Sequence, residues 1–248
     1  MRRLARYVLR RRKRRTEPPG RPKLLIFDFD GTIADTFAAA VTILNTLAGE
    51  FGFRPLQPID LERARDMRTR QLMKFLNIPT RQMSRIARRG SEELHARIHS
   101  IQPLPGMPGA LRQLQAQGYS LGIITSNTEV NVQIFLQNHG LELFDFVRCS
   151  SKLLGKARMI RSVMRRQRVR AADILFVGDE TRDIEAAKKA GIRMAAVTWG
   201  YNSRRSLDAM KPDLVFETPA ELVHYLANRY PAQSDSGEPA LQRESPVS

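Results

Sequence analysis

Residues that mark several common classes of protein are scarce in this chain of 248 residues. A single cysteine, Cys149, excludes an internal disulfide, which favours a reducing, cytoplasmic environment. The four histidines show no zinc-ligand spacing. No stretch approaches the roughly 20 uninterrupted apolar residues that span a bilayer. With 42% apolar and 27% charged residues, the composition instead predicts a globular protein that can bury a sizeable core.

Acidic residues are outnumbered by basic ones, but the imbalance is local. Residues 1–23 contain eleven lysines and arginines against one acid, Glu17, and so carry most of the net charge of +16. Three interpretations stay open for this segment. It binds a polyanion, such as RNA or an anionic membrane surface; it is an organelle presequence; or it is a solvated, disordered extension, which is the usual state of a block of like charge.

Changes of pattern divide the chain into four parts. Pro18, Pro19 and Gly20 separate the basic segment from the rest. Helical periodicity then dominates residues 37–103, where glycine and proline breaks indicate about four helices. We predict a basic, disordered tail over residues 1–22, a core formed by residues 23–36 and 104–228, a helical insertion over residues 37–103, and a disordered tail over residues 229–248.

The core alternates short apolar runs with helical patterns. Strands are predicted at residues 24–27, 120–125, 144–148, 173–178, 193–198 and 214–216. Helices are predicted at residues 109–117, 130–138, 156–166, 183–190 and 220–228. Strands and helices that alternate with short connections indicate an α/β fold with a Rossmann-like, doubly wound parallel sheet.

Polar side chains with related chemistry follow four of the predicted strands. They are Asp28, Asp30, Ser126, Lys156, Asp179 and Asp183. The carboxyl ends of parallel strands converge on the crevice where ligands bind, so these groups are expected to meet. Carboxylates suit a hard cation and a nucleophile, while the hydroxyl and the ammonium suit phosphate oxygens. The set therefore favours phosphoryl transfer.

Four short motifs resemble those of the haloacid dehalogenase-like superfamily. They are residues 28–32 (DFDGT), 124–127 (ITSN), 155–157 (GKA) and 177–183 (VGDETRD). They occur in the order that the family has, and the resemblance extends over about residues 23–228. Four motifs in order are much stronger evidence than one, because an isolated DFDGT after an apolar run is more often a turn.

The resemblance implies roles for the first and fourth motifs. Asp28 would be the nucleophile that forms an aspartyl-phosphate, and it would also bind Mg²⁺. Asp30 would protonate the leaving oxygen, later deprotonate a water molecule, and give its backbone carbonyl to the metal. Thr32 would steady Asp30 and border the substrate. Asp179 and Asp183 would complete the metal site.

The second and third motifs would hold the phosphoryl group. Ser126 would donate a hydrogen bond to its oxygens, with help from the backbone amide of Asn127. Lys156 would neutralise charge on the nucleophile and on the group being transferred. Lys152 is an alternative to Lys156, but Lys156 follows a glycine at a predicted helix start, as in the family.

The resemblance also bears on the substrate. In part of the superfamily, an insertion at the position of residues 37–103 is a helical cap that covers the site. Its basic residues could bind a second anionic group, such as a carboxylate, or form a solvated face; they are Arg63, Arg65, Arg68, Arg70 and Lys74. Residues 197–201 (VTWGY) resemble a loop of phosphoglycolate phosphatases, in which Trp199 either packs under the loop or contacts the substrate.

We therefore predict a phosphatase, since a carboxylate at position 30 distinguishes phosphate-ester hydrolysis from the chemistry of the pumps and true dehalogenases of the superfamily. A small phosphorylated metabolite is the expected substrate, with phosphoglycolate as the leading candidate. A pyrophosphatase, a nucleotidase or a sugar phosphatase would fit the same motifs. The alternative of a different class is a polyanion-binding or scaffolding protein with a vestigial phosphatase fold. The sequence does not define an oligomeric state.

Overall fold

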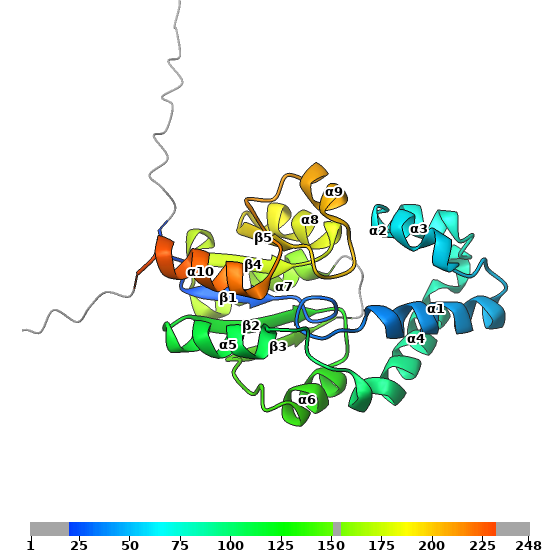
Figure 1. Cartoon of the computed structure of the whole chain (residues 1–248), viewed down its shortest axis with the longest axis horizontal. Helices are drawn as coiled ribbons and strands as arrows, with labels where there is room; N and C mark the ends of the chain where they lie inside the picture. The colour runs from blue at the N-terminus through cyan, green and yellow to red at the C-terminus, as the bar shows by residue number, and fades with distance from the viewer. Residues whose placement is uncertain (1–19, 151–154, 232–248) are drawn as a thin grey trace, which may run out of the picture.

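A sheet of six parallel strands forms the centre of the computed structural model, which describes residues 20–150 and 155–231 (Figure 1). The strand order is β3-β2-β1-β4-β5-β6, with every neighbouring pair parallel. The strands are β1 (Leu24–Phe27), β2 (Ser120–Thr125), β3 (Phe146–Cys149), β4 (Ile174–Gly178), β5 (Arg193–Val197) and β6 (Leu214–Phe216). The predicted fold class is thereby confirmed.

Both faces of the sheet are covered, as the unbroken apolar character of β1 requires. Leu25 and Phe27 belong to one apolar cluster, with helices α5, α6 and α10. Leu24 and Ile26 point to the opposite face and a second cluster, with α7, α8 and α9. These helices are α5 (Met107–Ala116), α6 (Glu129–Asn138), α7 (Lys156–Gln167), α8 (Thr181–Ala190), α9 (Arg204–Ala209) and α10 (Pro219–Arg229).

The strand order determines where polar side chains gather. Strand β1 lies between β2 and β4, so the loops after these three strands are neighbours. They follow the carboxyl ends of the strands, on both sides of the position where the winding of the sheet reverses. This is the edge at which open α/β sheets bind ligands.

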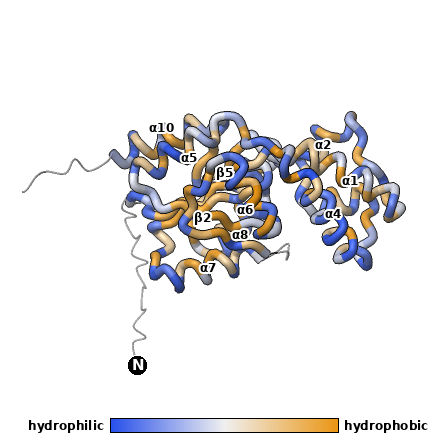
Figure 2. The backbone as a smooth tube through the Cα atoms, turned by 90° about the horizontal axis from the view of Figure 1, so that it is seen from below, coloured by the Kyte–Doolittle hydropathy of each residue, from blue (hydrophilic) through white to orange (hydrophobic). Residues whose placement is uncertain are grey.

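Residues 37–103, between β1 and β2, contain four α-helices, as predicted, which gather beside the sheet in both views (Figures 1 and 2). They are α1 (Phe37–Phe51), α2 (Leu61–Arg65), α3 (Thr69–Phe75) and α4 (Met83–Arg97). They share an apolar cluster of their own, in which Leu76 is fully buried. We refer to these helices and their connections as the insertion; its predicted limits, 37–103, stay a prediction.

The predicted elements differ from the observed ones mainly at their ends. Helix α8 begins at Thr181 rather than at residue 183, and α6 begins after Thr128, whose side chain accepts a hydrogen bond from the amide of Asn131. Helix α9 was not predicted. It has six residues, of which Leu207 is buried, too few to show a helical period.

The predicted tails fall mostly outside the described residues. Of residues 1–22, only 20–22 are described, and of residues 229–248 only 229–231. Among the helices of the described ranges, none combines the length and the apolarity needed to cross a bilayer.

We predict that Leu76→Ala lowers the free energy of unfolding by about 2–5 kcal/mol, because it leaves a cavity in the apolar cluster of the insertion. Ile59→Ala is the control, since Ile59 is 90% exposed and its truncation should change stability by less than about 0.5 kcal/mol. Denaturant unfolding followed by circular dichroism measures both. Equal effects of the two substitutions would contradict a packed core in the insertion.

Candidate active site

Lys156 joins two carboxylates from distant parts of the chain. It lies at the start of α7, and its Nζ donates to Oδ2 of Asp28, just beyond β1, and to Oδ1 of Asp183 on α8, the latter at 2.6 Å. The Lys156 side chain is only 5% exposed. Burial opposes its charge, but the negative charges of Asp183 and Asp28 raise the pKa of Lys156 above its ordinary value, so the ammonium form persists.

Three carboxylates form a buried cluster beside this lysine. One oxygen each of Asp28, Asp179 and Asp183 lies within 4.8 Å of the others, and all three residues are at most 1% exposed. Burial and the charges of Glu180 and Asp28 raise the pKa of Asp179 well above its ordinary value. Such crowded anions are expected where carboxylates share a cation. An all-oxygen donor set fits a hard divalent ion such as Mg²⁺.

Asp179 is held by contacts with both of its oxygens. Oδ1 accepts a hydrogen bond from the hydroxyl of Thr32 at 2.6 Å, and Oδ2 accepts one from the backbone amide of Tyr201 at 2.7 Å. Gly31 and Gly200 lie against the same carboxylate, where a Cβ atom at either position would overlap it. Thr32, expected to steady Asp30, therefore steadies a candidate metal ligand instead. Its contact with substrate stays a prediction.

Asp30 lies next to this cluster but faces a cavity. Its two oxygens accept from Nδ2 of Asn127 at 3.1 and 3.2 Å. Burial and the neighbouring charge of Asp28 raise the pKa of Asp30 to about 7, which suits a group that first donates and then accepts a proton. The backbone amide of Asn127, expected to face a phosphate, instead donates to Oγ1 of Thr125 at 3.0 Å.

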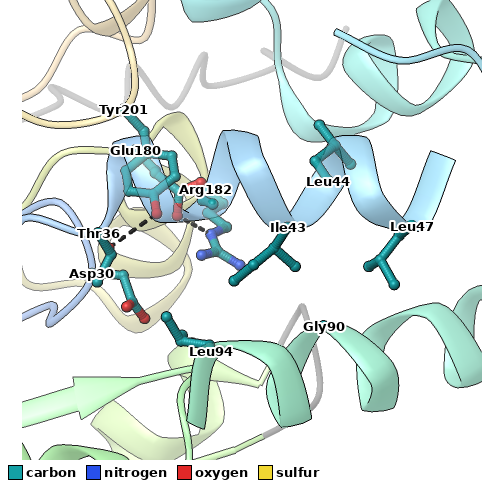
Figure 3. A pocket seen from close by; sticks show the side chains of 11 residues that line it. Asp30, Thr36, Ile43, Leu44, Leu47, Gly90, Leu94, Glu180, Arg182 and Tyr201 are labelled. Atoms are coloured by element: carbon teal, nitrogen blue, oxygen red, sulfur yellow. Dashed lines mark hydrogen bonds and ion pairs between the residues drawn. The ribbon is translucent and has the colours of Figure 1, made fainter. Parts of the chain in front are cut away.

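The cavity, which we name the Asp30 cavity, has a volume of about 240 Å³ and is bounded by the core and the insertion (Figure 3). Core residues Asp30, Glu180, Arg182 and Tyr201 line one side of it. The insertion contributes apolar residues, which are Ala40, Ile43, Leu44, Leu47, Gly90 and Leu94. A group released beside Asp30 would therefore lie between an aliphatic surface and polar core side chains.

Arg182 supplies the positive charge in the lining of this cavity. Its guanidinium forms an ion pair with Glu180, and its Nη2 lies 3.3 Å from Oγ of Ser126. Figure 3 shows the guanidinium at the same end of the cavity as Asp30, near Ile43. Ser126, predicted to contact the phosphoryl group, thus borders the site through Arg182.

The structure brings together the predicted residues of all four motifs, although their roles stay predictions. Lys152 lies outside the described residues, whereas Lys156 contacts the predicted nucleophile. The indole of Trp199 packs against the core and donates to the carbonyl of Thr32 at 3.2 Å, and Trp199 does not line the Asp30 cavity.

None of the five predicted cationic residues of the insertion lines the Asp30 cavity. Arg63 and Arg65 lie over the rings of Phe75 and Phe37. Arg65 also lines a separate cavity of about 210 Å³, together with residues that include Phe37 and Tyr201. These basic residues, which could bind an anion or form a solvated face, are therefore partly engaged with aromatic rings.

Three features of the site were not predicted from the sequence. The aliphatic lining comes from α1 and α4, whose apolar residues also form the core of the insertion. Tyr201 lines the Asp30 cavity and bonds through its hydroxyl to Thr36 at 3.0 Å. The Asn127 side chain bonds to Asp30. Asn127 and Tyr201 belong to the second motif and to the loop of residues 197–201, so the sequence indicated both residues but neither of these contacts.

The sequence is similar to haloacid dehalogenase-like hydrolases and to phosphoglycolate phosphatases. The sequence profile described as "Haloacid dehalogenase-like hydrolase" matches residues 25–197. A phosphoglycolate phosphatase of Synechococcus elongatus is 37% identical over 200 residues, covering 80% of this chain and 94% of that protein. Phosphoglycolate phosphatase 1 of Pseudomonas aeruginosa is 28% identical over 243 residues, covering 91% and 88%.

A solved structure shows the same fold at lower identity. The crystal structure of a predicted phosphatase from Clostridium acetobutylicum superposes with a TM-score of 0.73 and 20% identity. The match covers 84% of this chain and 100% of that one.

We predict that Gly200→Ala weakens binding of a divalent cation, because the new Cβ would displace the Asp179 carboxylate. Calorimetric titration with Mg²⁺ should show an affinity lower by about 10- to 100-fold, the loss typical when the groups that orient a ligand are disturbed. Gly109→Ala is the control: a Cβ there meets nothing within 4 Å, and affinity should not change. Unchanged affinity in Gly200→Ala would show that Asp179 does not hold the ion.

Proposed function

The chain belongs to the haloacid dehalogenase-like hydrolase family and is a phosphatase, and we propose that it hydrolyses a small carboxylated phosphate monoester such as phosphoglycolate, with Mg²⁺ as its cofactor. One observation carries the proposal. Asp28 is buried against Lys156 and two further carboxylates, while Asp30, two residues later, faces a cavity of about 240 Å³. In the proposed mechanism, Asp28 attacks phosphorus and Asp30 protonates the leaving oxygen on the side of the cavity.

The reaction follows from these positions. A carboxylate oxygen of Asp28 attacks phosphorus, and the bond from phosphorus to the ester oxygen breaks. Asp30 transfers its proton to that oxygen, so that a neutral alcohol leaves. Ionised Asp30 then takes a proton from water as the water attacks the aspartyl-phosphate, which releases inorganic phosphate and restores both residues.

The other predicted residues support this sequence of steps. Lys156 offsets negative charge on Asp28 and on the transferring group, and Ser126 donates to a phosphoryl oxygen. Asp28, Asp179 and Asp183 would hold Mg²⁺, which supplies charge neutralisation for the phosphoryl oxygens when bound. Thr32 contributes through Asp179, to which its hydroxyl donates.

The substrate proposal rests on the relatives and on Arg182. Two relatives are named phosphoglycolate phosphatases, and the leaving group of that ester carries a carboxylate. Because Asp30 protonates the leaving oxygen, the leaving group must occupy the Asp30 cavity. Arg182, which is also paired with Glu180, is the cation in the lining of this cavity and is therefore the proposed partner of a carboxylate, while the aliphatic side of the insertion offers no polar partner.

The polyanion-binding alternative is not favoured, because the residues of all four motifs are intact and lie together. Binding of RNA or of an anionic membrane by residues 1–23 stays a prediction, as does a cytoplasmic location.

We predict that Asp28→Asn lowers Mg²⁺-dependent phosphate release from p-nitrophenyl phosphate and phosphoglycolate by at least about 10³-fold, since an amide is a poor nucleophile. Asp30→Asn should lower turnover by about 10²–10⁴-fold through loss of proton transfer. Release of phosphate is measured with and without a chelator. An active Asp28→Asn enzyme would contradict the mechanism.

We predict that Arg182→Met lowers kcat/KM for phosphoglycolate by about 10- to 100-fold, the loss expected for one charged hydrogen-bonding group. For p-nitrophenyl phosphate, which has no carboxylate, the change should be less than about 3-fold. Arg63→Met, which alters a cation outside the Asp30 cavity, is the control and should affect neither substrate. An equal loss for both esters would mean that Arg182 binds the phosphoryl group instead.

A further inference from the structure

A chain of hydrogen bonds leads from the insertion to Asp30. It starts at His95 on α4, passes through Asn131 on α6 and Asn127 after β2, and ends at the Asp30 carboxylate. The distances are 2.7 Å from His95 Nδ1 to Asn131 Oδ1, 2.9 Å from Asn131 Nδ2 to Asn127 Oδ1, and 3.1 Å from Asn127 Nδ2 to Asp30 Oδ1. We name these four residues the His95–Asp30 chain.

The chain has one direction. Asn127 donates to a carboxylate, so its amide oxygen faces the other way, toward the amide of Thr128 at 2.8 Å and Nδ2 of Asn131. Nδ2 of Asn131 donates to the oxygen of Asn127, so Oδ1 of Asn131 is the atom that faces His95. An amide oxygen accepts only, so His95 Nδ1 carries a proton and donates it. His95 therefore donates to Asn131, Asn131 donates to Asn127, and Asn127 donates to Asp30.

Asn131 is a polar residue in apolar surroundings. It is fully buried, in a helix that packs Val132 and Phe135 into the main core. An amide in such surroundings is tolerated when its polar atoms are paired, and both ends of this one are. Replacing it with an apolar residue would leave the oxygen of Asn127 without one of its two donors, so that Asn127 could turn away from Asp30.

A second contact of the same type provides a contrast. His99, which follows α4, lies 3.1 Å through Nδ1 from Nδ2 of Asn138 at the end of α6. This pair also joins the insertion side to α6, but it is exposed. Within the part of the chain that the structure describes, no hydrogen bond connects Asn138 onward to Asp30 or Asn127.

We propose that His95 and Asn131 are positioning residues for Asp30, which hold its carboxylate toward the leaving oxygen through Asn127. The proposal rests on the acid role of Asp30 in the proposed function. A proton donor acts only when it lies within hydrogen-bond reach of the leaving oxygen, and misplacement by about 1 Å can cost 10²-fold in rate. The hydrogen bond between His95 on α4 and Asn131 on α6 would therefore affect proton transfer by Asp30, and not only the enclosure of the substrate.

The leaving group distinguishes positioning from a general structural role. An alkoxide with a high pKa needs the proton of Asp30 to depart, whereas p-nitrophenolate departs with little help. Since kcat/KM reports steps up to phosphoryl transfer, a misplaced Asp30 lowers it for alkyl esters selectively. A loosened insertion or a disturbed fold lowers it for both.

The test compares kcat/KM for glycerol 3-phosphate or phosphoglycolate with that for p-nitrophenyl phosphate in the full-length enzyme with Mg²⁺. His95→Ala should reduce the alkyl-ester value by about 10-fold and Asn131→Ala by about 100-fold, with less than about 2-fold change for the aryl ester. His95→Gln, whose amide can still donate, should recover most of the loss. His99→Ala should change neither value.

Several results would overturn the proposal. Equal losses on both esters, no loss in His95→Ala, or the same selective loss in His99→Ala would each assign His95 and Asn131 a structural role only. Because His95 is exposed, its truncation keeps the test valid even if Asn131→Ala does not fold. If the unmodified enzyme hydrolyses neither ester, or if Asp30→Asn remains active, the proposed function itself fails, and this inference fails with it.

Discussion

The repulsion among buried carboxylates is the constraint on which the rest of the site depends. Asp28, Asp179 and Asp183 have almost no exposure to water, and Glu180 lies close by. Lys156 balances part of this charge, and the fold supplies further donors: the Thr32 hydroxyl and the Tyr201 amide. A cluster of this kind stores electrostatic energy that a divalent cation can release on binding, and the bound cation then offsets the negative charge of a phosphoryl group.

The same constraint explains the local backbone. The loop after β1 passes so near Asp179 that only glycine fits at position 31, and the loop after β5 has the same requirement at position 200. Gly31 also has a positive φ of 74°, which few other residues adopt. The glycines are therefore required by the acidic side chains, because without a Cβ atom the backbone can approach the carboxylate of Asp179.

The sequence predicted the parts of the molecule that depend on short-range patterns. The bounds of β1, β2 and β6 came directly from apolar runs, and the motif residues were found as the polar residues just beyond such runs. Long-range partners could not be predicted, because a hydroxyl or amide does not indicate which of several nearby acceptors it will meet. Thr32 bonds to Asp179 rather than Asp30, and Asn127 uses its side chain rather than its backbone amide. Two arginines of the insertion, for which both anion binding and a solvated face were open, lie over Phe75 and Phe37.

The entry to the insertion and its exit are paired with each other. Ala34 bridges to both Asp30 and Pro103, and the amide of Asp35 donates to the carbonyl of Gln102 at 2.9 Å. Because the two ends of the insertion lie side by side, a different segment could replace it without straining the sheet. We call such a replacement segment a cassette and the rest of the protein its host. A transplanted cassette would keep the nucleophile and the cation site, which belong entirely to the host. It would need to bring its own donor for Asn131, and also backbone carbonyls to accept from the side chain of Asn202, which now donates to the carbonyls of Arg65 and Met67.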